Sequence, residues 1–175
     1  GGGMVRAGGV WGGGAWAVWL PAETAGSDRG VEAALRKGVR RVRVASSTHA
    51  VVVDGRDEVF DHRVYPRPDS RYGVSKVFGE ALGSLYADKY GMEVFNMRIG
   101  NVNPQPADER RLSIWISPRD FAQLVAIGID HPDIRFEIVY GVSGNKRSWY
   151  DNPNAELLGY RPIDDAEEFA DETLT

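Results

Sequence analysis

Apolar residues between positions 74 and 86 recur every three or four positions, which is the period of an α-helix. The recurring positions are Val74, Val77, Phe78, Ala81, Leu82, Leu85 and Tyr86. Gly91 follows them, and glycine is the preferred residue just beyond a helix C-terminus. The pattern therefore predicts a helix of several turns that begins near Tyr72 and ends at Gly91.

Further helices and strands are predicted from residue 28 onward. Helices are expected at 28–37, where Gly38 marks the end, at 117–130, where Ser117-Pro118 forms the first turn, and at 154–159. Strands are expected at 40–45, 92–99 and 134–142, where apolar and polar residues alternate or apolar residues cluster. The polar and proline-containing residues 51–70 are expected to form a loop.

This order of elements determines the expected fold class. Alternating helices and strands are typical of an α/β protein, with a parallel, Rossmann-like sheet flanked by helices. In such sheets ligands bind beyond the carboxyl ends of the strands. Two of those ends are predicted at residues 46–49 and 100–101. We therefore expect a functional site where these two segments meet.

Residues 1–27 differ in composition from the rest of the chain. Eight of the first fourteen residues are glycine, and three of the five tryptophans lie in this segment. We expect an irregular segment over residues 1–27, with a short strand at 16–20, followed by one domain over residues 28–175. The stretch 9–14 has the glycine density of a phosphate-binding loop, but it lacks the preceding strand that a dinucleotide fingerprint requires.

Composition excludes several classes of protein. The net charge of −4, with acidic and basic residues interleaved, argues against a nucleic-acid-binding face. The absence of cysteine excludes disulfides and thiolate chemistry. The three histidines have no metal-ligand spacing, so no metal site is expected. No apolar run is long enough to span a membrane, so no membrane partner is expected.

Tyr72 and Lys76 are the first candidates for chemistry. Residues four positions apart share one face of a helix. A lysine beside a tyrosine favours the phenolate and lowers the pKa of the phenol. Such a tyrosine can take a proton from an alcohol near neutral pH. The alternative is a core aromatic residue beside a solvated lysine, a pair that is common by chance.

Together with two flanking stretches, this pair resembles the extended short-chain dehydrogenase/reductase family, also called the NAD-dependent epimerase/dehydratase family. The stretches are Ala45-Ser46-Ser47, Tyr72-Gly73-Val74-Ser75-Lys76 and Arg98-Ile99-Gly100-Asn101-Val102. The resemblance covers about residues 28–170 and is greatest to uronate dehydrogenases. Residues 46–49, 110–115, 148–152 and 158–162 support that narrower resemblance.

The resemblance implies a cytoplasmic enzyme that uses NAD to oxidise a hexuronic acid, galacturonate or glucuronate, at the anomeric carbon to an aldarolactone. Its catalytic residues would be Ser47, Tyr72 and Lys76. Tyr72 would be the general base. Lys76 would activate Tyr72 and also bond the ribose of the nicotinamide. Asn101 would lie near both the nicotinamide and the substrate.

The resemblance also implies a substrate site. Arg110 would bind the sugar carboxylate, and a guanidinium suits this role because it forms a bidentate pair with a carboxylate. The alternative for Arg110 is a surface charge in the run 108–111. Ser47, Thr48 and His49 would contact the sugar, although His49 could instead be a partly buried histidine bonded to backbone. Thr48 departs from the family, which usually has asparagine at this position.

Two alternatives remain open at this stage. One is a nucleotide-sugar epimerase or dehydratase of the same family, which keeps NAD bound. The other is a truncated homologue without catalysis, because the 46 residues before Ser47 contain no convincing glycine-rich βαβ unit. The sheet would then be incomplete on its N-terminal side. Its exposed edge and apolar face would favour pairing with another chain, such as in a homo-oligomer.

Overall fold

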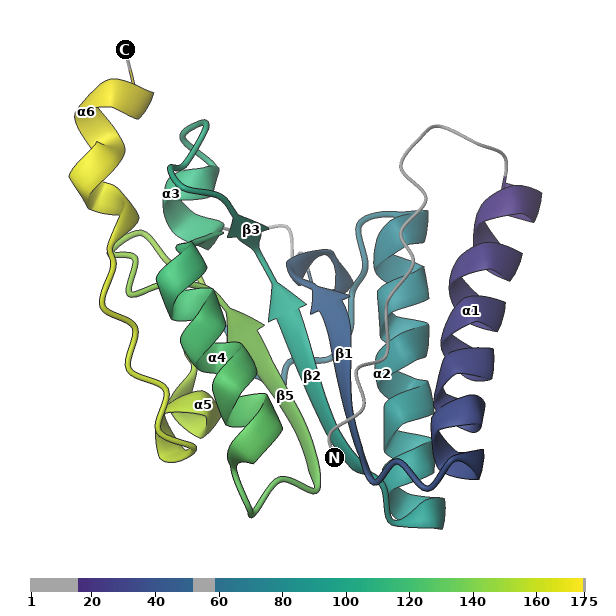
Figure 1. Ribbon diagram of the computed structural model, residues 1–175. Helices are drawn as coiled ribbons and strands as arrows, with labels where there is room; N and C mark the ends of the chain where they lie inside the picture. The colour runs from purple at the N-terminus through teal and green to yellow at the C-terminus, as the bar shows by residue number, and fades with distance from the viewer. Residues whose placement is uncertain (1–15, 52–58, 175) are drawn as a thin grey trace.

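A computed structural model describes residues 16–51 and 59–174. Three parallel strands form the central sheet in the order β1–β2–β5 (Figure 1). They are β1 (Arg41–Ser47), β2 (Glu93–Ile99) and β5 (Phe136–Gly141). All three predicted strands are present, and their parallel pairing confirms the expected α/β class.

The register of the strands places their carboxyl ends side by side. Ser47 at the end of β1 pairs with Ile99 at the end of β2, and Ile99 pairs with Gly141 at the end of β5. The polar residues that follow each strand therefore meet at one edge of the sheet, as the sequence predicts.

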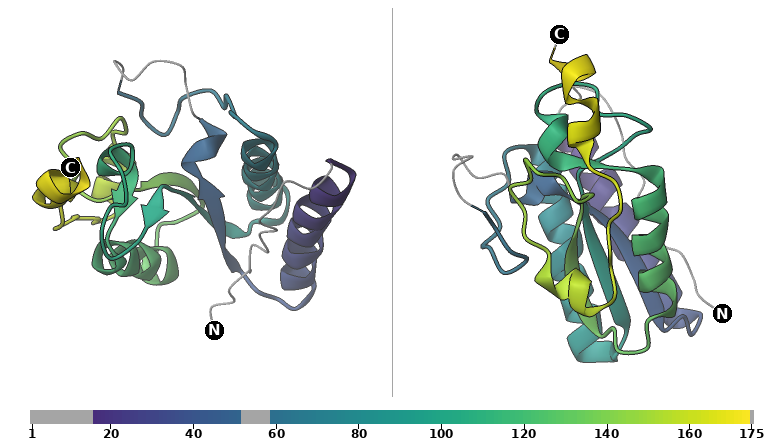
Figure 2. Two further views of the ribbon diagram at one scale, coloured as in Figure 1. Left: turned by 90° about the horizontal axis from the view of Figure 1, so that it is seen from above. Right: turned by 90° about the vertical axis from the view of Figure 1, so that its left-hand side faces the viewer.

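Helices cover both faces of the sheet (Figures 1 and 2). Helices α1 (Trp16–Arg36) and α2 (Arg71–Tyr90) lie on one face, and α4 (Pro118–Asp130) lies on the other. Alternate residues of β2 serve the two cores: Val94 packs in the core shared with α1 and α2, whereas Phe95 packs with Leu124 of α4. A strand covered on both faces needs apolar residues on both sides, as β2 has.

The predicted long helix is confirmed as α2. Ser70 caps its N-terminus by accepting a hydrogen bond from the backbone N–H of Gly73, and Gly91 ends it in the left-handed conformation, at φ 68°. Only part of the apolar repeat is buried, however: Tyr86 is 5% exposed, whereas Val74, Phe78 and Leu85 are 40%, 37% and 50% exposed. The buried positions are instead mostly small or charged: Gly73, Ser75, Lys76, Gly79, Glu80, Gly83, Tyr86 and Ala87.

Helix α1 corrects the prediction for the N-terminal region. It ends at Arg36, close to the predicted end, but it begins at Trp16 rather than at Asp28. The expected strand at 16–20 is therefore wrong, and the helix runs across the predicted boundary at residue 27. Alanine, leucine and glutamate between residues 17 and 25 favour a helix, which needs no neighbouring strand to satisfy its backbone. Residues 1–15, including the glycine-rich stretch 9–14, lie outside the described residues.

Several short elements complete the fold, and the sequence patterns predict only α5 among them. They are η1 (Thr48–Ala50), β3 (Asn101–Val102), α3 (Arg111–Ile114), β4 (Trp115–Ile116), α5 (Pro153–Leu157), η2 (Ala166–Phe169) and α6 (Ala170–Thr173). β3 and β4 pair in parallel as a separate two-stranded sheet. In the described ranges, no helix combines the length and the apolar character that crossing a membrane requires.

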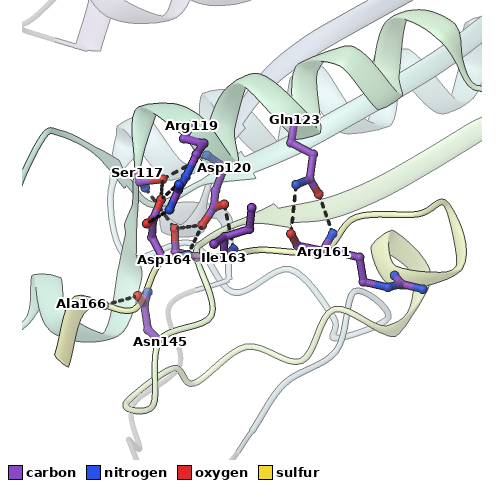
Figure 3. A network of polar contacts seen from close by, with 10 residues as sticks. Ser117, Arg119, Asp120, Gln123, Asn145, Arg161, Ile163, Asp164 and Ala166 are labelled. Atoms are coloured by element: carbon purple, nitrogen blue, oxygen red, sulfur yellow. Dashed lines mark hydrogen bonds and ion pairs between the residues drawn. The ribbon is translucent and has the colours of Figure 1, made fainter. Parts of the chain in front are cut away.

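The C-terminal segment is attached to the N-terminal half of α4 by polar contacts (Figure 3). The fully buried carboxylate of Asp120 accepts hydrogen bonds from the backbone N–H groups of Ile163, at 2.9 Å, and Asp164, at 3.1 Å. It also accepts one from the hydroxyl of Ser143, at 2.6 Å. Three donors on one buried carboxylate compensate for its removal from water. Asp120 therefore connects α4, the end of β5 and the C-terminal segment.

Candidate active site

The candidate site lies at the carboxyl edge of the sheet, where η1 follows β1 and the first turn of α2 packs against η1. A Cβ atom added to Gly73 would lie 2.2 Å from the carbonyl oxygen of His49. Only glycine permits this approach of helix to backbone. The glycine of the Tyr72–Lys76 motif thus has a steric role: it brings the start of α2 close to η1, which follows Ser47.

Ser47 is buried and faces β2. Its hydroxyl accepts a hydrogen bond from the backbone N–H of His49, at 3.3 Å, and lies 3.5 Å from the carbonyl oxygen of Ile99. The first contact caps η1, and the second reaches the paired residue of the neighbouring strand. Ser47 is therefore held at the junction of β1, β2 and η1, where the sequence places a site.

Tyr72 and Lys76 lie in the first two turns of α2 and are close in space, as their spacing predicts. The ammonium nitrogen of Lys76 lies 5.0 Å from the centroid of the Tyr72 ring. Lys76 is buried and Tyr72 is half-buried. A cation in this position is attracted to the ring face and favours negative charge on the phenol. The arrangement suits a tyrosine that exchanges a proton with a bound alcohol.

His49 contacts Tyr72 and a carboxylate that sequence patterns do not identify. Its ring meets the Tyr72 ring edge-on, with centroids 5.7 Å apart. Its Nδ1 lies 2.8 Å from one carboxylate oxygen of Asp69 and 3.0 Å from the other. Partial burial would raise the pKa of Asp69, but hydrogen bonds from His49 and Ser70 and the charge of Arg110 lower it. Asp69 is thus an additional candidate residue.

Thr48 is buried, and its hydroxyl hydrogen-bonds the phenol of Tyr150, a second residue that sequence analysis missed. Burial raises the pKa of Tyr150 to about 12, against opposing effects from the Thr48 hydrogen bond and the charge of Arg110. The Tyr150 ring stacks on Tyr140, with centroids 4.3 Å apart. Thr48 therefore contacts another side chain of the site, Tyr150. The two residues are far apart in the sequence, so no local pattern predicts this contact.

Arg110 and Asn101 lie in the segment that follows β2. Arg110 is exposed at the start of α3, and its charge influences both Asp69 and Tyr150. The neighbouring Arg111 pairs instead with Asp108. Asn101 is half-buried in β3, and its side-chain oxygen accepts a hydrogen bond from Asn103, at 2.7 Å. The charge of Arg110 thus reaches Asp69 and Tyr150, whereas the recorded side-chain contact of Asn101 is with Asn103.

A buried ion pair lies one turn further along α2. Glu80 accepts two hydrogen bonds from the guanidinium of Arg98 in β2, both at 2.9 Å, and one from the hydroxyl of Ser46, at 2.6 Å. Burial opposes the charge of Arg98, but the hydrogen bonds and charge of Glu80 outweigh it and raise the pKa of the guanidinium. The pair joins α2 to the strand residues adjacent to Ser47 and Ile99.

The described residues fit one end of a dinucleotide. The ammonium of Lys76 and the phenol of Tyr72 are donors suited to ribose hydroxyls, and they lie at the carboxyl edge, where such ligands bind. A pyrophosphate would need a glycine-rich turn from a strand into a helix. Across residues 16–51 and 59–174 no strand precedes β1, so that turn is not found within these ranges. The donors at this edge therefore suit a ribose, and the described ranges show no seat for a pyrophosphate.

The chain is similar to several dehydrogenases. Uronate dehydrogenase of Pseudomonas putida is 44% identical over 138 residues, which are 79% of this chain and 52% of that enzyme. The crystal structure of glucuronic acid dehydrogenase from Chromohalobacter salexigens has a TM-score of 0.92 at 37% identity, covering 99% of this chain and 65% of that one. A tyrosine-to-alanine mutant of uronate dehydrogenase from Agrobacterium tumefaciens, complexed with NAD, has a TM-score of 0.90 at 35% identity, covering 95% and 63%.

The chain spans about half the length of the curated relatives it matches. The sequence profile of the NAD dependent epimerase/dehydratase family matches residues 14–120, which is more than half of the chain. The matched range contains Ser47, Tyr72, Lys76 and Arg110, together with the parallel pairing of β1 and β2. The chain belongs to the NAD dependent epimerase/dehydratase family.

Proposed function

We propose that the protein oxidises a hexuronic acid, galacturonate or glucuronate, at the anomeric carbon to an aldarolactone, with NAD as the oxidant. The observation that carries the proposal is the close contact between the Tyr72–Lys76 pair and η1, which directly follows Ser47. The influence of Arg110 on Asp69 and Tyr150, which contact η1, adds a cation suited to a sugar acid. Similarity to uronate and glucuronic acid dehydrogenases supports the same substrate class.

The proton step is assigned to Tyr72. Its phenolate accepts the proton of the anomeric hydroxyl while the C–H bond of the same carbon breaks, so the carbon–oxygen bond becomes a lactone carbonyl. Lys76 favours the phenolate form by its charge. Ser47 donates a hydrogen bond to the sugar oxygen and stabilises the negative charge that develops there. When bound, NAD would supply the acceptor for the hydride that leaves the anomeric carbon.

The remaining candidates are assigned to binding. Lys76 and Tyr72 bond the nicotinamide ribose, and Asn101 lies at the boundary between cofactor and sugar. Arg110 holds the carboxylate of the uronic acid as a bidentate pair. Thr48 and His49 contact sugar hydroxyls from η1. This division puts the carboxylate and the anomeric carbon at opposite ends of one site.

We also propose that the protein acts in the cytoplasm as a homo-oligomer. The exposed apolar residues Val74, Phe78 and Leu85 on α2 support association, because water-exposed apolar residues in a row favour burial against a partner. Sedimentation of the purified protein tests this part, and a single monomeric species at all concentrations would contradict it.

The enzymatic proposal is tested by incubating the purified chain with NAD and each uronic acid and following the absorbance of NADH. Continuous formation of NADH with galacturonate or glucuronate is expected, with no net NADH from UDP-glucose. An epimerase or dehydratase would convert the nucleotide sugar without releasing NADH. Calorimetric titration with NAD supplies the binding readout. Failure to form NADH from either uronate, with NAD bound, would contradict the proposal.

A further inference from the structure

We propose that Asp69 is a positioning residue that holds Nδ1 of His49 and leaves Nε2 to accept a hydrogen bond from a sugar hydroxyl. This inference rests on the proposed function, because it assigns the polar contact that recognises the sugar. Asp69 itself contacts His49 and Ser70, and it acts on the sugar through the imidazole.

Both oxygens of one carboxylate hold one ring nitrogen. Asp69 Oδ2 lies 2.8 Å and Oδ1 3.0 Å from His49 Nδ1. An ionised carboxylate only accepts hydrogen bonds, so Nδ1 must carry the hydrogen. In an imidazole that carries its single hydrogen on Nδ1, the lone pair is on Nε2, which is then an acceptor. The lowered pKa of Asp69 keeps the carboxylate ionised at neutral pH.

The contact is built into the start of the helix that carries Tyr72. The hydroxyl of Ser70 donates to Asp69, at 2.8 Å, and accepts from the backbone N–H of Gly73, at 3.1 Å. The His49 ring meets the Tyr72 ring edge-on. Asp69, the helix cap, His49 and Tyr72 therefore form one connected unit. A sugar hydroxyl bound at Nε2 would be fixed relative to the proposed general base.

A direct readout is the tautomer of His49, measured by ¹⁵N NMR of the histidine side chains in the full chain. The His49→Gln spectrum assigns the signals. The Nδ1–H tautomer is expected in the unaltered protein, and Asp69→Asn should shift the population toward Nε2–H, because an amide can also donate. Predominant Nε2–H in the unaltered protein would overturn the inference, and this measurement needs no activity.

The functional readout is the Asp69→Asn variant in the NADH assay. The KM for the uronic acid should rise about tenfold, the effect of losing one well-oriented hydrogen bond, while kcat changes much less. Asp61→Asn is the matched control, since Asp61 lies in the same loop and its carboxylate accepts a hydrogen bond from the backbone N–H of Arg63. Equal KM values in the two variants would overturn the inference. A complete absence of uronate oxidation before any substitution would refute the proposed function instead.

Discussion

Arg98 and Glu80 form a bidentate ion pair next to the candidate site, with both side chains almost completely buried, at 2% and 5% exposure. Removing one partner of such a pair leaves an uncompensated charge in the interior. We therefore expect Glu80→Gln to lower the free energy of unfolding by about 3–5 kcal/mol. Urea unfolding followed by circular dichroism measures this loss.

The exposed pair of Arg36 and Glu32, one turn apart on α1, is the natural comparison. Arg36→Ala should change the free energy of unfolding far less than Glu80→Gln does, because water screens the pair. Replacing both buried partners together by methionine should cost less than Glu80→Gln alone, since no buried charge remains. A cost for Glu80→Gln similar to that of Arg36→Ala would show that the buried pair is not a structural link.

Gly73 and Gly79 provide a second test on the same helix. A Cβ atom at Gly73 would lie 2.2 Å from the carbonyl oxygen of His49, whereas one at Gly79 would lie 3.7 Å from Val44, an ordinary contact. Gly73→Ala should therefore destabilise the protein by about 1–3 kcal/mol and displace Tyr72, with loss of activity. Gly79→Ala should be neutral or stabilising by up to about 1 kcal/mol, because alanine favours helix. Thermal unfolding measures the stability of both variants, and the NADH assay measures their activity. Equal effects of the two substitutions would contradict the close approach of Gly73 to the carbonyl of His49.

Local signals explain which parts of the fold were predictable. Ser117-Pro118 and Gly91 are strong boundary residues, and the structure begins α4 and ends α2 where they indicate. Composition was misleading at the N-terminus. The glycine and tryptophan content predicted an irregular segment, whereas helix-forming residues extend α1 back to Trp16. The two-residue strands β3 and β4 are too short to show a periodic pattern.

The site was predictable only where its residues follow one another along the chain. Tyr72 and Lys76 share a helix face, so their proximity follows from their spacing. Asp69 meets His49 because the loop between them returns to η1, and no periodicity encodes that return. The buried face of α2 was also hidden, because glycine, lysine and glutamate occupy much of it, while the apolar residues Val74, Phe78 and Leu85 are exposed.

The carboxylate of Asp120 should make a measurable contribution to attachment of the C-terminal segment (Figure 3). Asp120→Ala leaves the N–H groups of Ile163 and Asp164 without their acceptor. A loss of about 2–4 kcal/mol is expected, because each buried donor left unpaired costs about 1–3 kcal/mol. Hydrogen exchange should show faster exchange at these two amides. Asp130→Ala, at the exposed end of the same helix, should leave the exchange of these two amides unchanged. Slowed or unaltered exchange in Asp120→Ala would contradict the role of Asp120 in attaching the C-terminal segment.

Acid should weaken the same region through Asp164. Hydrogen bonds from Arg119 and Ser117 lower the pKa of its carboxyl below the ordinary value of 3.8. The unfolded chain therefore takes up this proton more readily, so the contribution to stability is present above pH 3.8 and is lost as the pH falls through the lower folded value. Urea unfolding measures the difference in free energy of unfolding between the unaltered protein and Asp164→Asn. This difference should become smaller as the pH falls through this range. A difference that is constant with pH would contradict the assignment.

The central claim is that Tyr72 moves the proton in the oxidation of a uronic acid. Tyr72→Phe keeps the ring beside Lys76 and His49 but removes the phenol. The comparison is with Tyr90→Phe, at the exposed end of the same helix. The decisive measurement is the rate of NADH formation from galacturonate and glucuronate, with NAD affinity measured in parallel by calorimetry. We predict that Tyr72→Phe lowers the rate of NADH formation by about a hundredfold or more and leaves NAD affinity nearly unchanged. A rate in Tyr72→Phe equal to that in Tyr90→Phe would contradict the role of Tyr72 in proton transfer.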